Sequence, residues 1–269
     1  MSHVRKQNIF NTAWAMVRFT LFWIIVVLQL PIIVFLPRRA GVRYMRVFMW
    51  FLVFLSGIKI RVHGTLSKHR PLLVVTNHIS LFEIATYPIA FGGSFVAKKE
   101  VESWPIVGWV AKKFGVIFVD RRPSHAAEAL KTVSATVTRV KYPMYVFPEG
   151  TTTNGAYVKK FKSSLFNFVE NSDVMVQPMA MHYRFRDGTH ISDADLAEHY
   201  GYFNNRDMEM GPLCSRERSA FMQVFHIMVI GGFTVEITVL PAPALHGMDR
   251  KHIADTLYKI VSTEYMENK

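Results

Sequence analysis

A histidine and a carboxylate follow an apolar run early in the chain. His78 and Glu83 lie five positions apart, directly after the run at residues 72–76. Partners on one face of a helix are three or four positions apart, so a helix alone does not bring these two together. A loop that turns into a helix can fold Glu83 back onto the ring, which leaves the other imidazole nitrogen to accept a proton from a hydroxyl. The alternative is a loop histidine that satisfies local backbone groups.

Two further apolar runs end in polar and charged side chains. Residues 145–155 read YVFPEGTTTNG, and residues 115–122 end in Asp120, Arg121 and Arg122. Ligands of parallel α/β sheets bind at the carboxyl ends of strands. Backbone amides, threonine hydroxyls and the nearby Lys162 suit an anionic headgroup, and adjacent arginines suit a phosphate. The alternatives are an ordinary strand-to-loop turn and a surface ion pair with Asp120.

Seven short apolar runs predict the strands that must position these side chains. They lie at residues 58–62, 72–76, 94–97, 116–119, 144–147, 174–179 and 234–240. Apolar residues at helical spacing predict a helix after Pro123 and another that closes the chain around Ile253 and Leu257. Strands that alternate with helices predict an α/β fold, with a mixed, mostly parallel sheet flanked by helices. We expect this domain to occupy residues 59–269.

The positive charge of the chain is concentrated in its first third. The net charge is +12, and residues 1–82 contain eleven Lys and Arg but no Asp or Glu. These charges flank apolar runs rich in Phe, Trp and Leu, whereas nucleic-acid binders usually spread Lys and Arg along a polar face. The pattern therefore favours a membrane surface as partner and argues against nucleic acid.

Two apolar runs in this first third predict a membrane attachment. Residues 19–36 are uncharged, and as a helix they would extend about 27 Å, close to the thickness of a bilayer core. The run at residues 48–58 is too short to span. Residues 1–58 are therefore predicted to form a pair of membrane-attachment helices, with the first either spanning or entering one leaflet. The basic cluster at residues 38–46 favours the cytoplasmic side for the domain that follows.

Composition and missing motifs exclude several classes of protein. The chain is 50% hydrophobic and 19% charged, which excludes a disordered protein. The single cysteine, Cys214, excludes a disulfide scaffold and a cysteine-ligated metal site. The sequence has no HExxH pair, no G-x-S-x-G nucleophile elbow and no phosphate-binding glycine-rich loop. We therefore expect neither a metal nor a cofactor.

Four blocks, in order over residues 72–182, resemble the glycerolipid and lysophospholipid acyltransferase family. The family's N-H-x4-D block corresponds here to Asn77, His78 and Glu83. A second block corresponds to residues 98–101, 104–109 and 115–121. The F-P-E-G-T block stands intact at residues 147–151, and the fourth block, an apolar strand that ends in proline, corresponds to residues 176–178.

The resemblance implies a membrane-bound O-acyltransferase of phospholipid biosynthesis. His78, held by Glu83, would deprotonate the free hydroxyl of a lysolipid such as 1-acyl-glycerol-3-phosphate as it attacks an acyl thioester. Acyl-CoA or acyl carrier protein would be the donor and co-substrate, and the lipid bilayer a partner. A bacterial inner membrane, with the catalytic domain on its cytoplasmic side, would be the location. The resemblance places these residues at the acceptor headgroup: Asn77, Arg121, Glu149, Gly150, Thr151 and Lys162.

Two departures from the family pattern bear on the acceptor. Glu83 replaces the commoner Asp, and Thr152 stands where lysophosphatidic acid enzymes usually carry an arginine. Loss of a bidentate phosphate ligand weakens the case for a free phosphomonoester. The sequence of residues 149–155 is closer to that of acyltransferases for lyso-ornithine lipid and for lysophosphocholine or lysophosphoethanolamine. A sugar-lipid acceptor and a non-catalytic lipid-binding role are the remaining alternatives.

Overall fold

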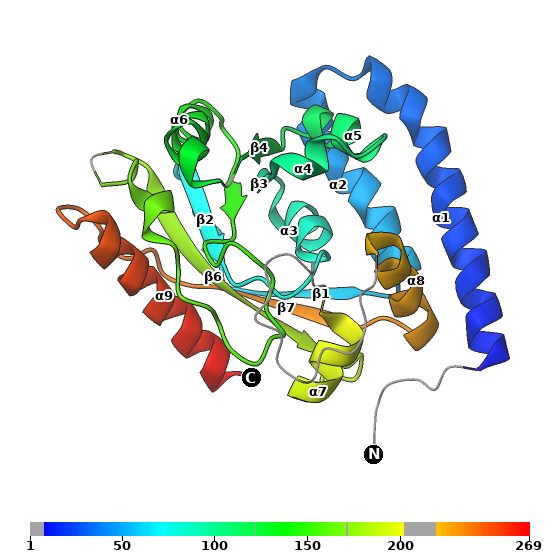
Figure 1. Cartoon of the computed structure of the whole chain (residues 1–269). Helices are drawn as coiled ribbons and strands as arrows, with labels where there is room; N and C mark the ends of the chain where they lie inside the picture. Colours follow the sequence, from blue (N-terminus) through cyan, green and yellow to red (C-terminus); the bar gives the residue numbers. More distant parts are fainter. Residues whose placement is uncertain (1–7, 121, 171, 202–218) are drawn as a thin grey trace.

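A seven-stranded sheet forms the centre of the molecule (Figure 1). The computed structural model describes residues 8–120, 122–170, 172–201 and 219–269. Within these residues the strand order is β1-β7-β6-β2-β5-β3-β4, and only β6 and β7 pair antiparallel. The strands are β1 (Lys59–His63), β2 (Leu72–Thr76), β3 (Ser94–Lys98), β4 (Ile117–Val119), β5 (Met144–Val146), β6 (Met175–Arg184) and β7 (Thr234–Val239). The predicted fold class is confirmed, and every predicted run overlaps one of these strands.

The most apolar strands lie in the middle of the sheet. All five residues of β2 and all three of β5 are buried, because a parallel sheet is covered on both faces. Val74 of β2 pairs with both Tyr145 of β5 and Gln177 of β6. The carboxyl ends of β2 and β5 therefore lie side by side, where these two parallel strands finish. At the outer edge, β1 is largely exposed and carries Lys59 and Arg61.

Strand β6 differs from the prediction of a strand that ends in proline. Pro178 lies in its interior, and the strand continues to Arg184. The antiparallel pairing with β7 begins one residue later, at Met179 and Val239, while the Pro178 carbonyl accepts a hydrogen bond from the Leu240 amide at 3.0 Å. The missing N–H of proline therefore falls just before this pairing begins, where a proline is tolerated.

Helices cover both faces of the sheet, and the predicted helices are present. The longer ones of the domain are α3 (Glu83–Phe91), α5 (Val107–Lys113), α6 (Ala126–Val137), α8 (Ala220–Ile230) and α9 (Arg250–Glu267). Short helical segments are α4 (Lys99–Glu102), η1 (Pro123–His125), η2 (Ser163–Phe166), α7 (Asp193–Asp195) and η3 (Leu196–Tyr200). Helix α9 begins after Asp249, which caps two backbone amides, and it packs along β6, where Tyr265 stacks on His182.

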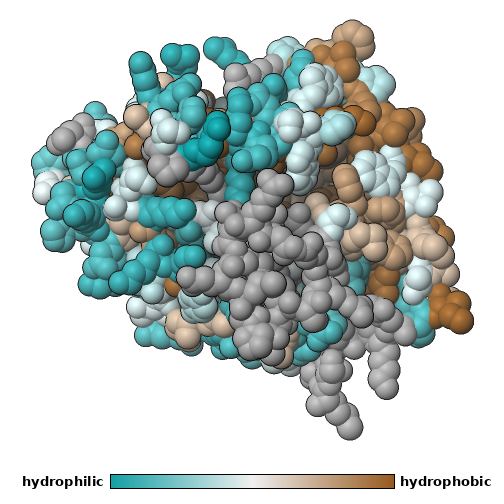
Figure 2. Space-filling view, in the orientation of Figure 1, coloured by the Kyte–Doolittle hydropathy of each residue, from teal (hydrophilic) through white to brown (hydrophobic). Residues whose placement is uncertain are grey.

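Helix α1 (Ile9–Phe35) precedes the sheet and is longer than the predicted apolar run. Asn8 caps its start by accepting a hydrogen bond from the Asn11 amide, so the helix begins ten residues before the run does. One face packs on the rest of the molecule, since Phe19 and Trp23 contact the α8 rings Phe225 and Phe221. The opposite face is exposed and apolar, and Figure 2 shows hydrophobic residues gathered along this side.

Among the residues that the structure describes, only one of the two predicted attachment helices is long and apolar enough to cross a membrane. That helix is α1. The predicted second run lies inside α2 (Arg38–Leu55), which also contains the basic cluster. Because its first half carries four arginines, α2 is amphipathic. The predicted pair is therefore one apolar helix of span length followed by one amphipathic helix.

Candidate active site

His78 and Glu83 meet at the carboxyl end of β2. The chain leaves β2 at Thr76, turns through a loop that carries His78, and enters α3 with Glu83 as its first residue. This turn brings His78 Nδ1 to 2.9 Å from Glu83 Oε2. The five-residue spacing is therefore bridged as predicted, by a loop that turns into a helix.

The Glu83 carboxylate is fully buried and is held by two further donors. The Ser80 amide donates to it at 3.0 Å, and the Tyr183 hydroxyl donates to Oε1 at 2.6 Å. Burial, followed by the negative charge of Glu83, raises the pKa of Tyr183 well above its ordinary value, so this hydroxyl remains a donor. A buried carboxylate with hydrogen bonds to both oxygens is fixed in place, and it fixes the imidazole ring in turn.

The segment after β5 clamps the His78 loop from the other side. The Phe147 ring stacks on the His78 ring, with 4.0 Å between ring centroids and 17° between planes. The His78 amide donates to Glu149 Oε1 at 2.6 Å, and the His78 carbonyl accepts from the Thr153 amide at 2.8 Å. Ring, amide and carbonyl of His78 are therefore all positioned by residues 147–153.

Glu149 is bonded to the backbone on both sides of the site. Its side chain is buried, and its second oxygen accepts a hydrogen bond from the Lys159 amide at 2.7 Å. Burial raises the pKa of Glu149 to about 8, although its hydrogen bonds with these two amides act in the opposite direction. With both oxygens bonded to backbone, Glu149 holds two loops together, whereas the prediction placed it at the acceptor headgroup.

Asn77 is also placed in the framework of the site. Its amide exchanges two hydrogen bonds with the backbone of Met181, at 2.8 and 2.9 Å, and is buried. This pair joins the loop after β2 to the neighbouring strand β6. The contact that the structure shows for Asn77 therefore orients the His78 loop, and its contact with the acceptor stays a prediction.

Gly150 and Lys162 lie together beside a small apolar cavity. A Cβ on Gly150 would come within 2.6 Å of Lys162 Nζ, and Gly150 has a φ of 78°, which favours glycine. Both residues line a cavity of about 120 Å³. Its other walls are formed by β3–β5, α6 and η2, through Val96, Val119, Asp120, Ala129, Leu130, Val133, Val146, Phe147, Ser164 and Leu165. Because Phe147 also stacks on His78, this cavity adjoins the histidine.

The remaining predicted residues divide into three cases. Thr151 is half-buried in the loop after Gly150. Arg122 forms the ion pair with Asp120 that the sequence left as an alternative, and its hydrogen bonds lower the pKa of Asp120 to about 2. Arg121 and Cys214 lie outside the described residues.

Two positioning side chains were missed by the sequence analysis. Tyr183 lies 100 positions after Glu83, and only the placement of β6 beside β2 brings them together. Phe147 was noted as part of a motif, but nothing local indicates that its ring stacks on an imidazole. Neither contact has a signal in residue spacing, because each depends on the order of strands in the sheet.

The arrangement leaves one imidazole nitrogen available. Nδ1 is engaged by Glu83, while no described group forms a hydrogen bond with Nε2, and the side chain is 17% exposed. In the neutral ring, Nδ1–H donates to the carboxylate and Nε2 is the acceptor. His78 can therefore take a proton from a hydroxyl presented to its exposed side.

Comparison with known proteins matches this segment of the chain to acyltransferases. Residues 59–182 match the family model named Acyltransferase. The chain is 34% identical over 165 residues to a lyso-ornithine lipid O-acyltransferase of Pseudomonas aeruginosa, covering 58% of this chain and 63% of that protein. It is 28% identical to a 1-acyl-sn-glycerol-3-phosphate acyltransferase of Neisseria gonorrhoeae, covering 47% and 50% respectively. The matches therefore span between half and two thirds of these relatives.

A solved structure shares the fold over nearly the whole chain. The 1-acyl-sn-glycerophosphate acyltransferase PlsC of Thermotoga maritima aligns with a TM-score of 0.64 and 16% identity, over 96% of this chain and 97% of that one. Together, these matches confirm the predicted resemblance to the glycerolipid and lysophospholipid acyltransferases. The segment that matches the family model includes His78, Glu83 and the clamp at residues 147–153.

Proposed function

We propose that this chain, which resembles the acyltransferases over the segment that contains its histidine and glutamate, is a membrane-attached O-acyltransferase. It transfers a fatty acyl group from an acyl thioester to the free hydroxyl of a lysolipid. The observation that carries the proposal is the buried Glu83, which receives three hydrogen bonds and holds His78 Nδ1 at 2.9 Å. This pairing leaves Nε2 to act as general base.

The proposed step needs only the side chains of this chain and its two substrates. His78 Nε2 takes the proton of the acceptor hydroxyl as the oxygen attacks the thioester carbonyl. The C–O bond forms, the C–S bond breaks, and the proton on Nε2 passes to the departing sulfur. Glu83 stabilises the imidazolium between these two events, and the Phe147 stack restrains the ring.

The cavity beside His78 supports the same assignment. Its walls are mostly apolar, while Gly150 and the exposed Lys162 lie among its lining residues. An acyl chain suits the apolar walls, and an anionic group of either substrate suits the Lys162 ammonium. Among the predicted headgroup residues, Lys162 supports this assignment because it lines the cavity together with Gly150.

The two named relatives differ in acceptor, and Thr152 favours one of them. A lyso-ornithine lipid acceptor carries no phosphomonoester, and this chain has Thr152 where lysophosphatidic acid enzymes usually have arginine. We therefore place lyso-ornithine lipid first and 1-acyl-glycerol-3-phosphate second. The donor is acyl-CoA or acyl carrier protein.

Helix α1 is proposed to attach the enzyme to the cytoplasmic side of a bacterial inner membrane. Its buried residues run from Asn11 to Ile33, so the helix packs on the domain along almost its whole length. A helix packed in this way cannot cross a bilayer while the polar surface of the domain stays in water. The exposed apolar face of α1 therefore suits insertion into one leaflet, close to the acceptor's own acyl chain.

An acyl-transfer assay in detergent tests the proposal. Wild type and His78→Ala are compared with radiolabelled acyl-CoA and acyl carrier protein as donors, on a panel of lyso-ornithine lipid, lysophosphatidic acid, lysophosphatidylcholine and lysophosphatidylethanolamine. We expect turnover on one acceptor and a loss of about 10²- to 10⁴-fold in the variant.

His63→Ala is the matched control, because His63 lies on the exposed edge strand β1. It should keep full activity. Full activity in folded His78→Ala contradicts the assigned base. Binding of lysolipid without turnover on any acceptor would support the non-catalytic alternative.

A further inference from the structure

A basic cavity lies at the opposite end of the parallel strands from His78. It has a volume of about 940 Å³ and opens at the amino ends of β2, β5 and β3, just before each strand begins. Its floor includes Gly92, Gly93, Tyr142 and Pro143. Because β2 has five residues, its amino end and its carboxyl end are about 15 Å apart. The cavity is therefore separate from the proposed active site.

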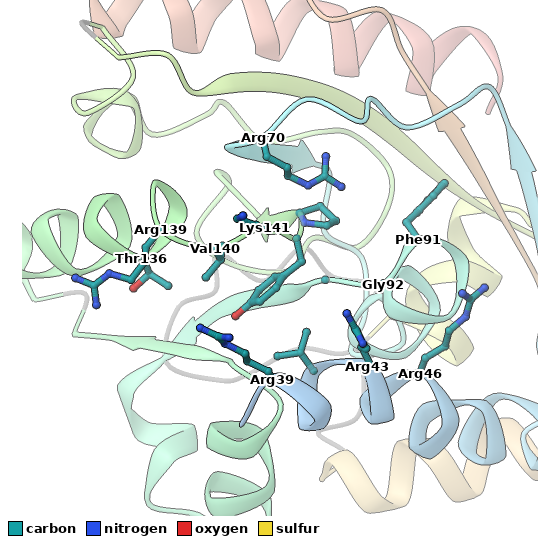
Figure 3. Close-up of a pocket in the computed structure, with 14 residues that line it drawn as sticks. Arg39, Arg43, Arg46, Arg70, Phe91, Gly92, Thr136, Arg139, Val140 and Lys141 are labelled. Carbon is teal, nitrogen blue, oxygen red and sulfur yellow. The ribbon is translucent and has the colours of Figure 1, made fainter. Parts of the chain in front are cut away.

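Among the described residues, six cationic side chains and no carboxylate line this cavity. Helix α2 supplies three of them along one stripe, and the segments before β2 and β5 supply the rest; the six are Arg39, Arg43, Arg46, Arg70, Arg139 and Lys141. Figure 3 shows Arg39 and Arg43 projecting from α2 toward the loop of Lys141, with Arg70 on the facing wall. Spacings of four and three residues place the three α2 arginines on one face of the helix.

These cations have no anionic partner in the part of the chain that the structure describes. Arg39, Arg43, Arg46, Arg139 and Lys141 form no ion pair there. Arg70 donates Nη1 to the carbonyls of Ser67 and His69, and its buried Nε has no partner among the described groups. Like charges gathered around one cavity repel one another, so an oligo-anionic ligand there would be stabilised by all of them.

The same helix face continues from arginine into exposed aromatic residues. Val47, Trp50 and Phe54 follow Arg43 at spacings of four, three and four, and they are 47%, 47% and 62% exposed. The end of α1 adjoins the first part of this face, since Leu36 lines a shallow cavity together with Arg43 and Val47, and the neighbouring Phe35 is 85% exposed. Trp and other apolar residues next to arginines are typical of a surface that lies at the headgroup level of a bilayer. This context favours a phosphate that arrives on a lipid.

We propose that the cavity between α2 and the amino ends of β2, β5 and β3 binds the phosphate headgroup of an anionic phospholipid. The ligand is recognised by arginine and lysine from two walls, and its acyl chains lie along the exposed aromatic stripe of α2. Gly92 keeps the floor open, since it has a φ of 74° and no heavy atom within 4 Å of the position that a Cβ would occupy. The site does not depend on the proposed acyl transfer.

Lipid retention by the full chain in neutral detergent tests this site. Native mass spectrometry measures the binding of phosphatidylglycerol and of phosphatidylcholine to wild type, to Arg39→Gln/Arg43→Gln, and to Lys141→Gln from the other wall. We expect one phosphatidylglycerol to bind in preference to phosphatidylcholine. The double variant should bind it about ten- to thirtyfold more weakly, and Lys141→Gln a few-fold more weakly.

A control of equal charge separates a site from general attraction. Arg250→Gln/Lys251→Gln removes two exposed cations from α9, far from α2, and should leave lipid binding unchanged. Equal weakening by both double variants overturns the proposal. The melting temperature of each variant establishes that it is folded.

A second arm distinguishes a lipid from a free phosphate. Inorganic pyrophosphate is added without lipid, and its effect on the melting temperature of wild type and Arg39→Gln/Arg43→Gln is measured. A small stabilisation of wild type that is lost in the variant, together with preferential lipid binding, supports the site. Stabilisation by pyrophosphate without any preference for phosphatidylglycerol overturns the lipid assignment and leaves a site for a free phosphate compound.

Discussion

Polar groups at the two ends of the same strands differ in how far they are satisfied within the protein. At the carboxyl ends of β2 and β5, the carboxyl groups of Glu83 and Glu149 are buried, and each of their oxygens is in a hydrogen bond. At the amino ends, the α2 arginines are exposed and form no ion pair within the described residues. The first end is complete without a ligand, and the second gathers charge that only a ligand would neutralise.

This difference indicates what each end is suited to do. Catalytic groups must hold one geometry before the substrate arrives, so their positioning groups are satisfied within the protein. A headgroup site can keep flexible, hydrated cations, because its ligand supplies the missing charge. Substitutions of the groups that position His78 should therefore change turnover and folding, and substitutions of the exposed cations at the amino ends should change ligand binding alone.

The largest effect is expected at Glu83. Glu83→Gln keeps the size of the side chain but removes the charge that stabilises the imidazolium, so kcat should fall by about 10²- to 10⁴-fold. Glu83→Asp keeps the charge but withdraws it by one methylene, and it should retain more activity than Glu83→Gln. Steady-state kinetics measure both variants. Glu128→Gln, on the exposed face of α6, is the control. An equally large fall in kcat in this control would contradict a specific role for the buried Glu83.

The next effect concerns Glu149 and pH. Its folded-state pKa is about 8, against an ordinary value of 4.5, so the folded protein holds this proton more tightly. The resulting stabilisation is fully present below pH 4.5 and is lost as the pH rises through 8, with a slope of at most about 1.4 kcal/mol per pH unit.

Glu149→Gln should remove this slope. The substitution should also lower the free energy of unfolding by about 2 kcal/mol, because the amide nitrogen of the new glutamine faces a backbone N–H donor. Urea unfolding between pH 5 and 8 measures the free energy of unfolding of both proteins. Parallel curves for wild type and variant would show that Glu149 binds no extra proton in the folded state.

A smaller effect is expected at Tyr183. Tyr183→Phe removes one hydrogen bond to Glu83, so it should cost about 1 kcal/mol of stability and lower kcat several-fold with KM unchanged. Tyr145→Phe is the matched control. It also removes one buried tyrosine hydroxyl, which donates to the Gly92 carbonyl at 2.8 Å near the amino end of β3. It should cost similar stability and leave kcat as it is. Equal loss of kcat in both would mean that Tyr183 acts through the fold alone.

The smallest effect on stability is expected at the basic cavity. Arg39→Gln/Arg43→Gln removes like charges that have no described carboxylate partner, so the free energy of unfolding in neutral detergent should change by less than about 0.5 kcal/mol. Any change should be a gain that diminishes at high salt. Thermal unfolding at two salt concentrations measures it. A loss above about 1 kcal/mol would show that these arginines support the fold itself.

The strands were predictable because each is a short apolar run bounded by polar residues. Both ends of Leu72–Thr76 were predicted correctly. A strand buried on both faces is a continuous apolar run, so its ends are marked by the polar residues that flank it. Helix α1 was underestimated, because Asn8 begins the helix before the uncharged run starts. The interior position of Pro178 was missed, because strand pairing beyond it depends on β7, more than fifty residues later.

The candidate site was predictable in its chemistry and less so in its contacts. His78 and Glu83 were recognisable from type and spacing, and the structure places them together. Asn77 and Glu149 carry polar groups that the family pattern assigns to the acceptor, yet Asn77 is turned to the backbone of strand β6 and Glu149 to the backbone of neighbouring loops. Spacing does not show whether a polar side chain faces a ligand or a backbone amide.

The sequence by itself determined the apolar runs, the basic first third and the residue types able to move a proton, because these are properties of local composition. Only the tertiary structure decided which groups meet. Strand order brings Tyr183 to Glu83, stacks Phe147 on His78, and separates six cations from the histidine by the length of a strand. These contacts join residues far apart in the chain, and their geometry comes from sheet packing.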